Sequence, residues 1–274
     1  MYFELNQDGA IGVFDSGLGG LTVLKEIISL LPQEDIVYFG DTARVPYGNK
    51  SPDVITRFTF ENIKFLLSKN IKALVIACNT ATAFSLVAAK QKFDLPILGV
   101  IEPGAKAAIK STIKNRIGII GTEGTINSNV YSSSIKQLNP GIELYSSPCP
   151  LFVPLVEEGW LKNEVTYKTA EIYLTDMKLY DIDTLILGCT HYPLLKEVIG
   201  EVMGETVKLI DSAKETAMAL KYLLESCSIL KKKNDLNGNR KFYVSDVPSR
   251  FEKVGRMFLG KELEKVELVI FENK

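Results

Sequence analysis

The chain has 274 residues, of which 46% are hydrophobic and 24% are charged, a composition typical of a globular protein with a packed core. Its 32 basic and 33 acidic residues give a formal net charge of −1, which favours a small ligand over a nucleic acid or an anionic membrane. The length exceeds that of a typical single domain and favours one large or two smaller domains.

Short β-rich runs alternate with amphipathic, helix-like segments along the first hundred residues. The runs cover 11–14, 35–40, 74–77 and 97–101. This alternation predicts βαβ units that build a parallel sheet.

Polar residues follow the first run, in the segment Asp15-Ser-Gly-Leu-Gly-Gly. Backbone amides at a helix start attract anions, and glycines let a ligand approach closely. The glycine spacing matches neither the dinucleotide nor the phosphate-loop motif, so a nucleotide is weakly supported and a carboxylate-bearing ligand stays open. A helix cap and a turn would explain Ser16 but would leave Asp15 without a role.

The second run leads into a polar loop, Gly40-Asp-Thr-Ala-Arg-Val-Pro-Tyr-Gly. Loops at strand ends commonly carry groups that orient a ligand. The proline and glycine of this loop could equally serve only to shape the turn.

The strand pattern restarts near residue 117 and mirrors the first set. The second set covers 117–122, 142–145, 184–187 and 207–210. Ile117-Gly-Ile-Ile-Gly-Thr echoes Ile11-Gly-Val-Phe-Asp-Ser at an offset of 106 residues, although α/β strands resemble one another in general. The hydroxyls of Thr122 and Thr125 then occupy the turn equivalent to Asp15-Ser-Gly and could hold a carboxylate.

The remaining segments are a helix-like stretch at 213–230, a polar turn at 231–240 and strand candidates at 241–245 and 266–271. We expect the turn to be solvated rather than a basic binding patch, and the last strands to return to the first domain. Breaks near Glu102-Pro-Gly and Asp211-Ser would divide the chain into two pseudo-symmetric α/β domains with mainly parallel sheets. The first would comprise 1–101 plus 211–274 and the second 102–210, with the active site in the cleft between them.

Two of the runs end on a cysteine, Ala73-Leu-Val-Ile-Ala-Cys-Asn-Thr and Thr184-Leu-Ile-Leu-Gly-Cys-Thr-His. Ligands of open α/β sheets bind at the carboxyl ends of the strands. Cys78 and Cys189 are therefore two matched proton-transferring groups that could approach one substrate from opposite sides, the geometry that inversion of a stereocentre needs. Either thiol alone could be an ordinary core cysteine.

His191 is the only histidine of the chain, and a lone histidine is usually structural. Its position beside a thiol at a strand end favours a role in managing a proton. A single histidine without a close cysteine pair argues against a zinc site, and we expect no metal. Cys149 and Cys227 lack such polar neighbours and are predicted to be packing residues.

No run of about 18 apolar residues predicts a spanning helix, and the amino terminus lacks the pattern of a signal peptide. We therefore expect a cytoplasmic protein. Four cysteines do not indicate a disulfide framework, and cytosolic thiols are normally reduced, which leaves cysteines available for catalysis.

The chain resembles the glutamate racemases of the cofactor-independent aspartate/glutamate racemase superfamily. The matching stretches are spread along the chain as far as residue 195 and are 14–24, 38–48, 77–82, 149–157 and 187–195. The resemblance implies an isomerase that interconverts L- and D-glutamate without a cofactor and supplies D-glutamate for peptidoglycan synthesis and the cell wall. It further implies a cytoplasmic protein, frequently a homodimer.

The resemblance also implies a role for each matched residue. Cys78 and Cys189 correspond to the two catalytic bases, with Asp15 as a helper near the first thiol and Glu157 and His191 as helpers near the second. The substrate contacts correspond to Asp15, Ser16, Tyr47, Gly48, Asn79, Thr80, Thr190 and His191.

Three other functions fit parts of the pattern. A related racemase that acts on aspartate or a hydantoin would share the thiols and differ in the pocket. A hydrolase with a cysteine nucleophile would need only one thiol and would form an acyl intermediate. An amino-acid-binding protein without catalysis would fit two α/β lobes around a cleft but would not require matched thiols.

Overall fold

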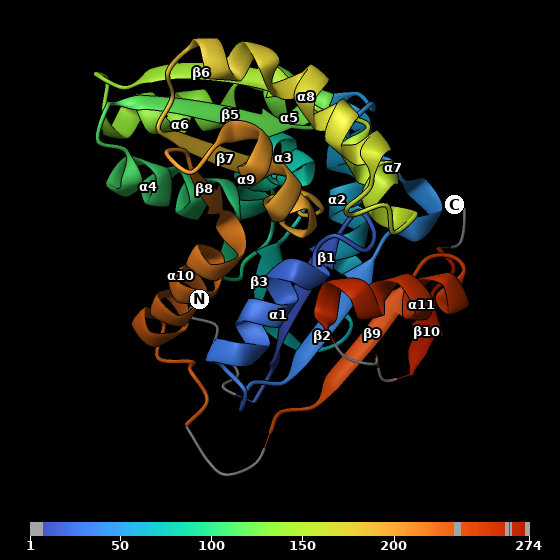
Figure 1. The fold of residues 1–274 in the computed structure, drawn as a ribbon. Coiled ribbons are helices and arrows are strands. Elements are labelled where there is room, and N and C mark those ends of the chain that lie inside the picture. Colours follow the sequence, from blue (N-terminus) through green and yellow to red (C-terminus); the bar gives the residue numbers. More distant parts are fainter. Residues whose placement is uncertain (1–7, 233–236, 261–262, 264, 272–274) are drawn as a thin grey trace.

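The computed structural model describes residues 8–232, 237–260, 263 and 265–271, and it shows an α/β protein with two sheets (Figure 1). The six strands of the first sheet have the order β10-β9-β2-β1-β3-β4, and the four strands of the second have the order β6-β5-β7-β8. Every strand pairing among the described residues is parallel. The predicted fold class is thus confirmed.

The strands of the first sheet come from both ends of the chain. They are β1 (Ala10–Asp15), β2 (Ile36–Gly40), β3 (Ile71–Ile76), β4 (Ile97–Gly99), β9 (Arg240–Val244) and β10 (Val266–Leu268). The second sheet consists of β5 (Arg116–Gly121), β6 (Glu143–Pro148), β7 (Thr184–Gly188) and β8 (Lys208–Asp211). β9 lies next to β2, so the last strands join the first sheet as expected. The division into two domains at the stated boundaries stays a prediction.

Helices cover the two sheets and connect their strands. They are α1 (Leu21–Leu30), α2 (Pro52–Leu67), α3 (Asn79–Lys92), α4 (Ile101–Ser111), α5 (Glu123–Asn127), α6 (Val130–Leu138), α7 (Phe152–Glu157), α8 (Glu164–Leu179), α9 (Lys196–Met203), α10 (Ser212–Ser226) and α11 (Pro248–Leu259), with short 3-10 turns at Thr42–Arg44 and Tyr192–Leu195. In Figure 1, α10 lies beside α1 and α11 lies over β9 and β10.

The two sheets repeat one arrangement. In the first, β1 pairs with β2 and β3, and β3 pairs with β4; in the second, β5 pairs with β6 and β7, and β7 pairs with β8. β1 and β7 are buried along their whole length, which explains their continuous apolar runs, because a parallel sheet covered on both faces offers no polar side. The equivalent order agrees with the sequence echo between the two halves.

Some element boundaries differ from the sequence prediction. The strand expected at 97–101 ends at Gly99, because Ile101 already begins α4. The helix expected at 213–230 ends at Ser226, and Ser228 has a positive φ of 56°, a conformation that stops a helix. The strand expected at 266–271 covers only Val266–Leu268, and residues 233–236 of the predicted polar turn lie outside the described part.

One hydrophobic cluster joins the two halves of the protein. It contains Leu21 and Leu24 of α1 together with Phe152 of α7 and Leu187 of β7. Two smaller clusters lie within the first and the second half. The halves are therefore packed against each other and not merely tethered.

Across the residues that the structure describes, none of the helices has the length and apolar character needed to cross a membrane.

Candidate active site

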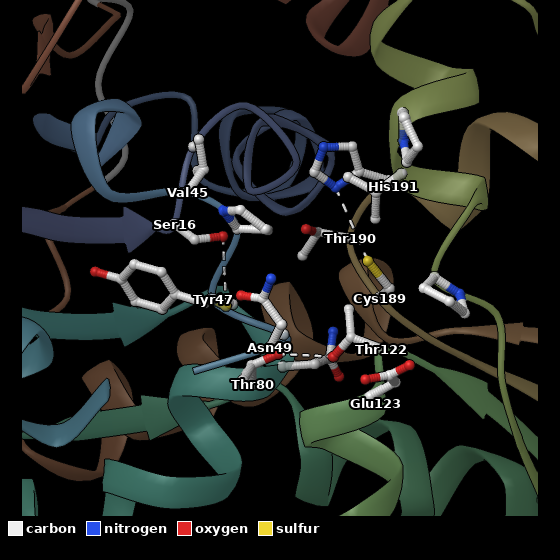
Figure 2. Close-up of a pocket in the computed structure, with 18 of the residues that line it drawn as sticks. Ser16, Val45, Tyr47, Asn49, Thr80, Thr122, Glu123, Cys189, Thr190 and His191 are labelled. Carbon is white, nitrogen blue, oxygen red and sulfur yellow. Dashed lines mark hydrogen bonds between the residues drawn. The ribbon is translucent and has the colours of Figure 1, made fainter. Parts of the chain in front are cut away.

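A cavity of about 500 Å³ lies where the carboxyl ends of β1, β3 and β7 meet (Figure 2). Ser16, Cys78 and Cys189 come directly after these strands or one residue later. The cavity is lined by Ser16, Gly17, Val45, Pro46, Tyr47, Gly48, Asn49, Cys78, Asn79, Thr80, Thr122, Glu123, Pro150, Val153, Pro154, Glu157, Gly188, Cys189, Thr190 and His191. The two cysteines that the sequence singles out, one after a strand of each sheet, thus face one common space.

The first thiol lies at the start of α3, where Cys78 is the N-cap residue. Its Sγ donates to Ser16 Oγ at 3.6 Å and accepts from the backbone N–H of Ala81 at 3.5 Å. Burial, followed by the nearby charge of Asp15, raises the pKa of the Cys78 thiol to about 12. Cys78 is therefore protonated at neutral pH in the ligand-free protein.

The second thiol begins a chain of three side chains. Cys189 Sγ lies 3.9 Å from His191 Nδ1, and His191 Nε2 lies 3.1 Å from Glu157 Oε1. Burial lowers the pKa of His191, but the contacts with Cys189 and Glu157 outweigh it and raise that pKa to about 10. Burial also opposes ionisation of Glu157, yet His191 and then Arg250 hold its pKa below the usual range. His191 is thus placed to exchange a proton with Cys189.

Asp15 lies behind the cavity wall and is fully buried. It accepts hydrogen bonds from the backbone N–H of Gly17 at 2.9 Å and from Thr190 Oγ1 at 3.4 Å. Burial raises the pKa of Asp15, and His191 acts in the opposite direction. Asp15 is therefore placed to act on Cys78 and Thr190 from behind. It is not among the lining residues, and the substrate contact expected for it stays a prediction.

Three threonine hydroxyls join the two halves at the floor of the cavity. Thr80 Oγ1 lies 2.9 Å from Thr122 Oγ1 and 3.2 Å from Thr125 Oγ1, and the last two are 3.0 Å apart. Figure 2 shows the contact between Thr80 and Thr122. Thr80 and Thr122 line the cavity, while Thr125 supports them from behind. Hydroxyl groups arranged in this way can donate to a carboxylate.

Asn79 carries a donor without a partner among the described residues. Its Oδ1 accepts from Tyr131 OH at 2.8 Å, while its Nδ2 is buried and unsatisfied. Asn79 lines the cavity. A buried amide donor usually has a partner, so an acceptor on a bound ligand is the natural one.

Tyr47 and Gly48 reach the cavity from the loop after β2. Figure 2 shows the Tyr47 hydroxyl directed away from the cavity, where it donates to Asp41 Oδ2 and accepts from Asn62 Nδ2. Tyr47 therefore offers its ring to a ligand and not its hydroxyl. Gly48 contacts the other half through its carbonyl, which accepts from the backbone N–H of Gly124 at 2.8 Å.

Gly19 shows why a glycine is needed at the start of α1. A Cβ built there would lie 2.1 Å from Thr190 Oγ1 and 2.5 Å from His191 Nδ1. Those separations are far below van der Waals contact. The tip of β1 and the segment after β7 can approach closely only because this position has no side chain.

Several lining residues were not singled out from the sequence. Val153 and Pro154 lie on α7 with Glu157, three or four residues before it and therefore on the same face of the helix, and Pro150 precedes the helix. This spacing relative to Glu157 is the sequence signal that could have identified them as lining residues. The others are Gly17, Val45, Pro46, Asn49, Glu123 and Gly188.

The four cysteines all lie in the described part of the chain and are free thiols. Cys149 is buried and its carbonyl accepts from Tyr192 OH, as fits a packing residue. In the same part of the chain, no group of three or more histidine, cysteine, aspartate or glutamate side chains could hold a metal ion.

Comparisons with known proteins agree with this geometry. The model of the Asp/Glu/hydantoin racemase family matches residues 11–220. A glutamate racemase of Geobacter metallireducens is 55% identical over 96% of this chain and 97% of its own length. The crystal structure of a glutamate racemase isoform from Bacillus anthracis superposes with a TM-score of 0.94 at 42% identity, covering 98% of this chain and 100% of that one.

A second solved structure is that of the glutamate racemase from Francisella tularensis in complex with D-glutamate. It has a TM-score of 0.89 and 42% identity and covers 96% of this chain and 98% of that chain. Matches of this extent over nearly the full length, on the same fold, show that the chain belongs to the Asp/Glu/hydantoin racemase family, in its glutamate racemase branch.

Proposed function

We propose that this protein is a glutamate racemase that inverts the α-carbon of free glutamate by two-base proton transfer between Cys78 and Cys189. The observation that carries the proposal is that both thiols, one from each half of the chain, line a single cavity. The near-full-length similarity to glutamate racemases supports glutamate as the substrate.

In each direction one sulfur removes the α-proton as a thiolate while the other, still a thiol, gives a proton to the opposite face. The C–H bond on one face breaks and its electron pair forms the new C–H bond on the other face. Cys78 is held as a thiol by its burial, whereas Cys189 has beside it His191, whose pKa is raised to about 10 and which can therefore donate a proton to the Cys189 sulfur as an imidazolium. These environments suit the direction in which Cys189 removes the α-proton and Cys78 donates one. The reverse direction requires Cys78 as the thiolate and Cys189 as the thiol.

The carbanion-like transition state needs stabilisation at the α-carboxylate. Electrostatic stabilisation by preorganised donors is often the largest catalytic contribution. Asn79 Nδ2, with its unmet hydrogen bond, and the hydroxyls of Thr80 and Thr190 are the donors we assign to this task. Ser16, Thr122 and the backbone at Gly48 complete the substrate contacts of the proposal.

The wider role is the one that the resemblance implies. The protein would supply D-glutamate for peptidoglycan synthesis in the cytoplasm and would act as a homodimer. Mass measurement in solution would test the dimer, and a monomer at assay concentration would refute it.

The decisive experiment follows the optical rotation of pure L- and D-glutamate with purified protein and no added cofactor. Because enantiomers have equal free energy, both reactions should reach the racemic mixture. Cys78→Ala and Cys189→Ala should each abolish racemisation while circular dichroism stays unchanged. Racemisation near the wild-type rate in either variant would refute the two-base assignment.

Solvent exchange and a second substrate separate the alternatives. In deuterated water each inversion should place deuterium at the α-carbon, and inverted product with its original hydrogen would exclude exchange through the thiols. Faster turnover of aspartate than of glutamate would indicate that the protein is an aspartate racemase of the same family and not a glutamate racemase.

A further inference from the structure

The last helix of the chain, α11, contacts the side chains around Cys189 from the other half of the molecule. α11 follows β9 and therefore belongs with the first sheet, whereas Cys189 and His191 follow β7 of the second. Two residues of α11 make the contact, one with His191 and one with Glu157.

Phe258 packs against the imidazole ring of His191. The ring centroids are 5.3 Å apart and the planes are nearly perpendicular, at 87°. Such edge-to-face contacts are favourable and fix ring orientation, and Phe258 is buried. Gly19 also lies close to the ring, since a Cβ built there would be 2.5 Å from His191 Nδ1, so two contacts of the imidazole come from the first half of the molecule.

Arg250 forms an ion pair with the carboxylate of Glu157. Its Nη2 lies 3.7 Å from Glu157 Oε2 and 3.5 Å from Glu158 Oε1. Glu157 Oε1, the other oxygen, faces His191 Nε2 at 3.1 Å. The carboxylate of Glu157 thus lies between a guanidinium of the first half and the imidazole of the second.

We propose that α11 is a positioning element of the Cys189 side, in which Arg250 holds Glu157 against His191 and Phe258 fixes the imidazole ring. The inference rests on the proposed function, because it concerns the proton transfer at Cys189. Neither residue lines the cavity, so both act through His191 and are not catalytic residues.

The pKa of His191 distinguishes a positioning role of Arg250 from a role that depends only on its charge. The titratable groups that face His191 are Cys189, Glu157, and Asp15 of β1, with Arg250 beyond Glu157. If the guanidinium acted only by its charge, Arg250→Gln would remove a repelling cation and raise the pKa of His191. If it holds the partly exposed Glu157 in place, its loss lets the carboxylate turn away and lowers that pKa from about 10.

The experiment uses the fact that His191 is the only histidine, so a single imidazole signal in the NMR spectrum reports its titration in the full-length protein. The variants are Arg250→Gln, Arg250→Lys and, as the matched control, Lys253→Gln, which removes an exposed charge one turn further along α11. Racemisation of L- and D-glutamate is measured for each variant across the pH range.

We expect a lower pKa of His191 in Arg250→Gln, together with a loss in kcat of about two- to fivefold, the range for a partly exposed ion pair. Arg250→Lys should lie nearer the wild type, and Lys253→Gln should match it. An unchanged or raised pKa in Arg250→Gln, or an equal loss in Lys253→Gln, would overturn the inference.

Phe258→Leu tests the second contact while keeping an apolar side chain in the core. The His191 ring signals should shift, because the perpendicular aromatic ring is lost, and kcat should fall with little change in KM. Unshifted ring signals, or a loss in kcat matched by an equal loss in Phe242→Leu, an aromatic core residue of β9, would overturn this part. A wild-type protein that does not racemise glutamate would instead refute the proposed function.

Discussion

At the scale of single residues, the environments of the two thiols differ although their positions correspond. Cys78 has Ser16 and a backbone N–H at its sulfur, whereas Cys189 has an imidazole that is itself bound to Glu157. The duplicated strand order supplies the symmetry of the site. The side chains that follow each strand supply its asymmetry.

The high pKa of Cys78 predicts how fast this thiol reacts with a neutral alkylating reagent. Only the thiolate is nucleophilic, and with a pKa of about 12 its fraction rises about tenfold for each pH unit below that value. We expect the rate of Cys78 labelling, followed by peptide mass spectrometry, to rise without a plateau from pH 7 to 10. A plateau near pH 8.5, the value for a free thiol, would contradict the assigned environment.

Gly19→Ala should impair racemisation without unfolding the protein. The new methyl group would push Thr190 and His191 away from Asp15 and Cys189, and a misplacement of about 1 Å can cost about 100-fold in rate. The matched control is Gly200→Ala in α9, where an added Cβ finds its nearest neighbour at 3.7 Å. Equal racemisation rates in the two variants would show that the close approach at Gly19 is unimportant.

At the scale of the elements, a buried ion pair ties the segment after α10 to the first sheet. Lys72 Nζ of β3 lies 2.7 Å from Glu34 Oε2, and both side chains are fully buried. The same ammonium donates to the carbonyl of Ile229, and Glu34 Oε1 accepts from the backbone N–H of Lys231. The chain is thereby fixed just before it returns towards β9.

Lys72→Met should destabilise the protein by about 3–5 kcal/mol, because it leaves the carboxylate of Glu34 buried without its cation. Lys106→Met, which removes an exposed pair with Glu102, should cost less than about 1 kcal/mol. Urea unfolding of both variants measures the difference. Similar free energies of unfolding would contradict the importance given to the buried pair.

The sequence was sufficient to predict the strands and the two thiols, because both signals are local. An apolar run that ends in a polar group needs no knowledge of distant residues. Tyr47 lines the cavity as its predicted substrate contact requires, but the sequence could not predict that Asp41 and Asn62 bind its hydroxyl, because Asn62 lies on a helix fifteen residues further on. The contacts of Arg250 and Phe258 were also beyond prediction, because they depend on how α11 packs against the opposite half.

The same limit applies to local structure at the scale of the elements. The Pro-Gly pair at 103–104, near which the sequence places a domain boundary, lies in the first turn of α4, and the boundary itself stays a prediction. A proline is tolerated there because the first N–H groups of a helix have no partner within it.

At the scale of the whole molecule, the shared hydrophobic cluster predicts that the halves depend on each other. The sheet of β5–β8 contributes residues to the same cluster as α1 and α11. We expect the fragment 102–210 alone to show no cooperative thermal unfolding, whereas the full chain unfolds cooperatively. A fragment with a sharp transition and native-like circular dichroism would show instead that this half is an independent domain.

The position of β9 and β10 also determines the order in which the protein can form during synthesis. β5 to β8 are contiguous along the chain, so all four strands of the second sheet are available as soon as β8 leaves the ribosome. The first sheet must wait with β2 as an open edge until residues 240–268 emerge. The amino-terminal half, although translated first, is therefore the last to be completed, and a chaperone that shields its unpaired edge would act on nascent chains longer than about 100 residues.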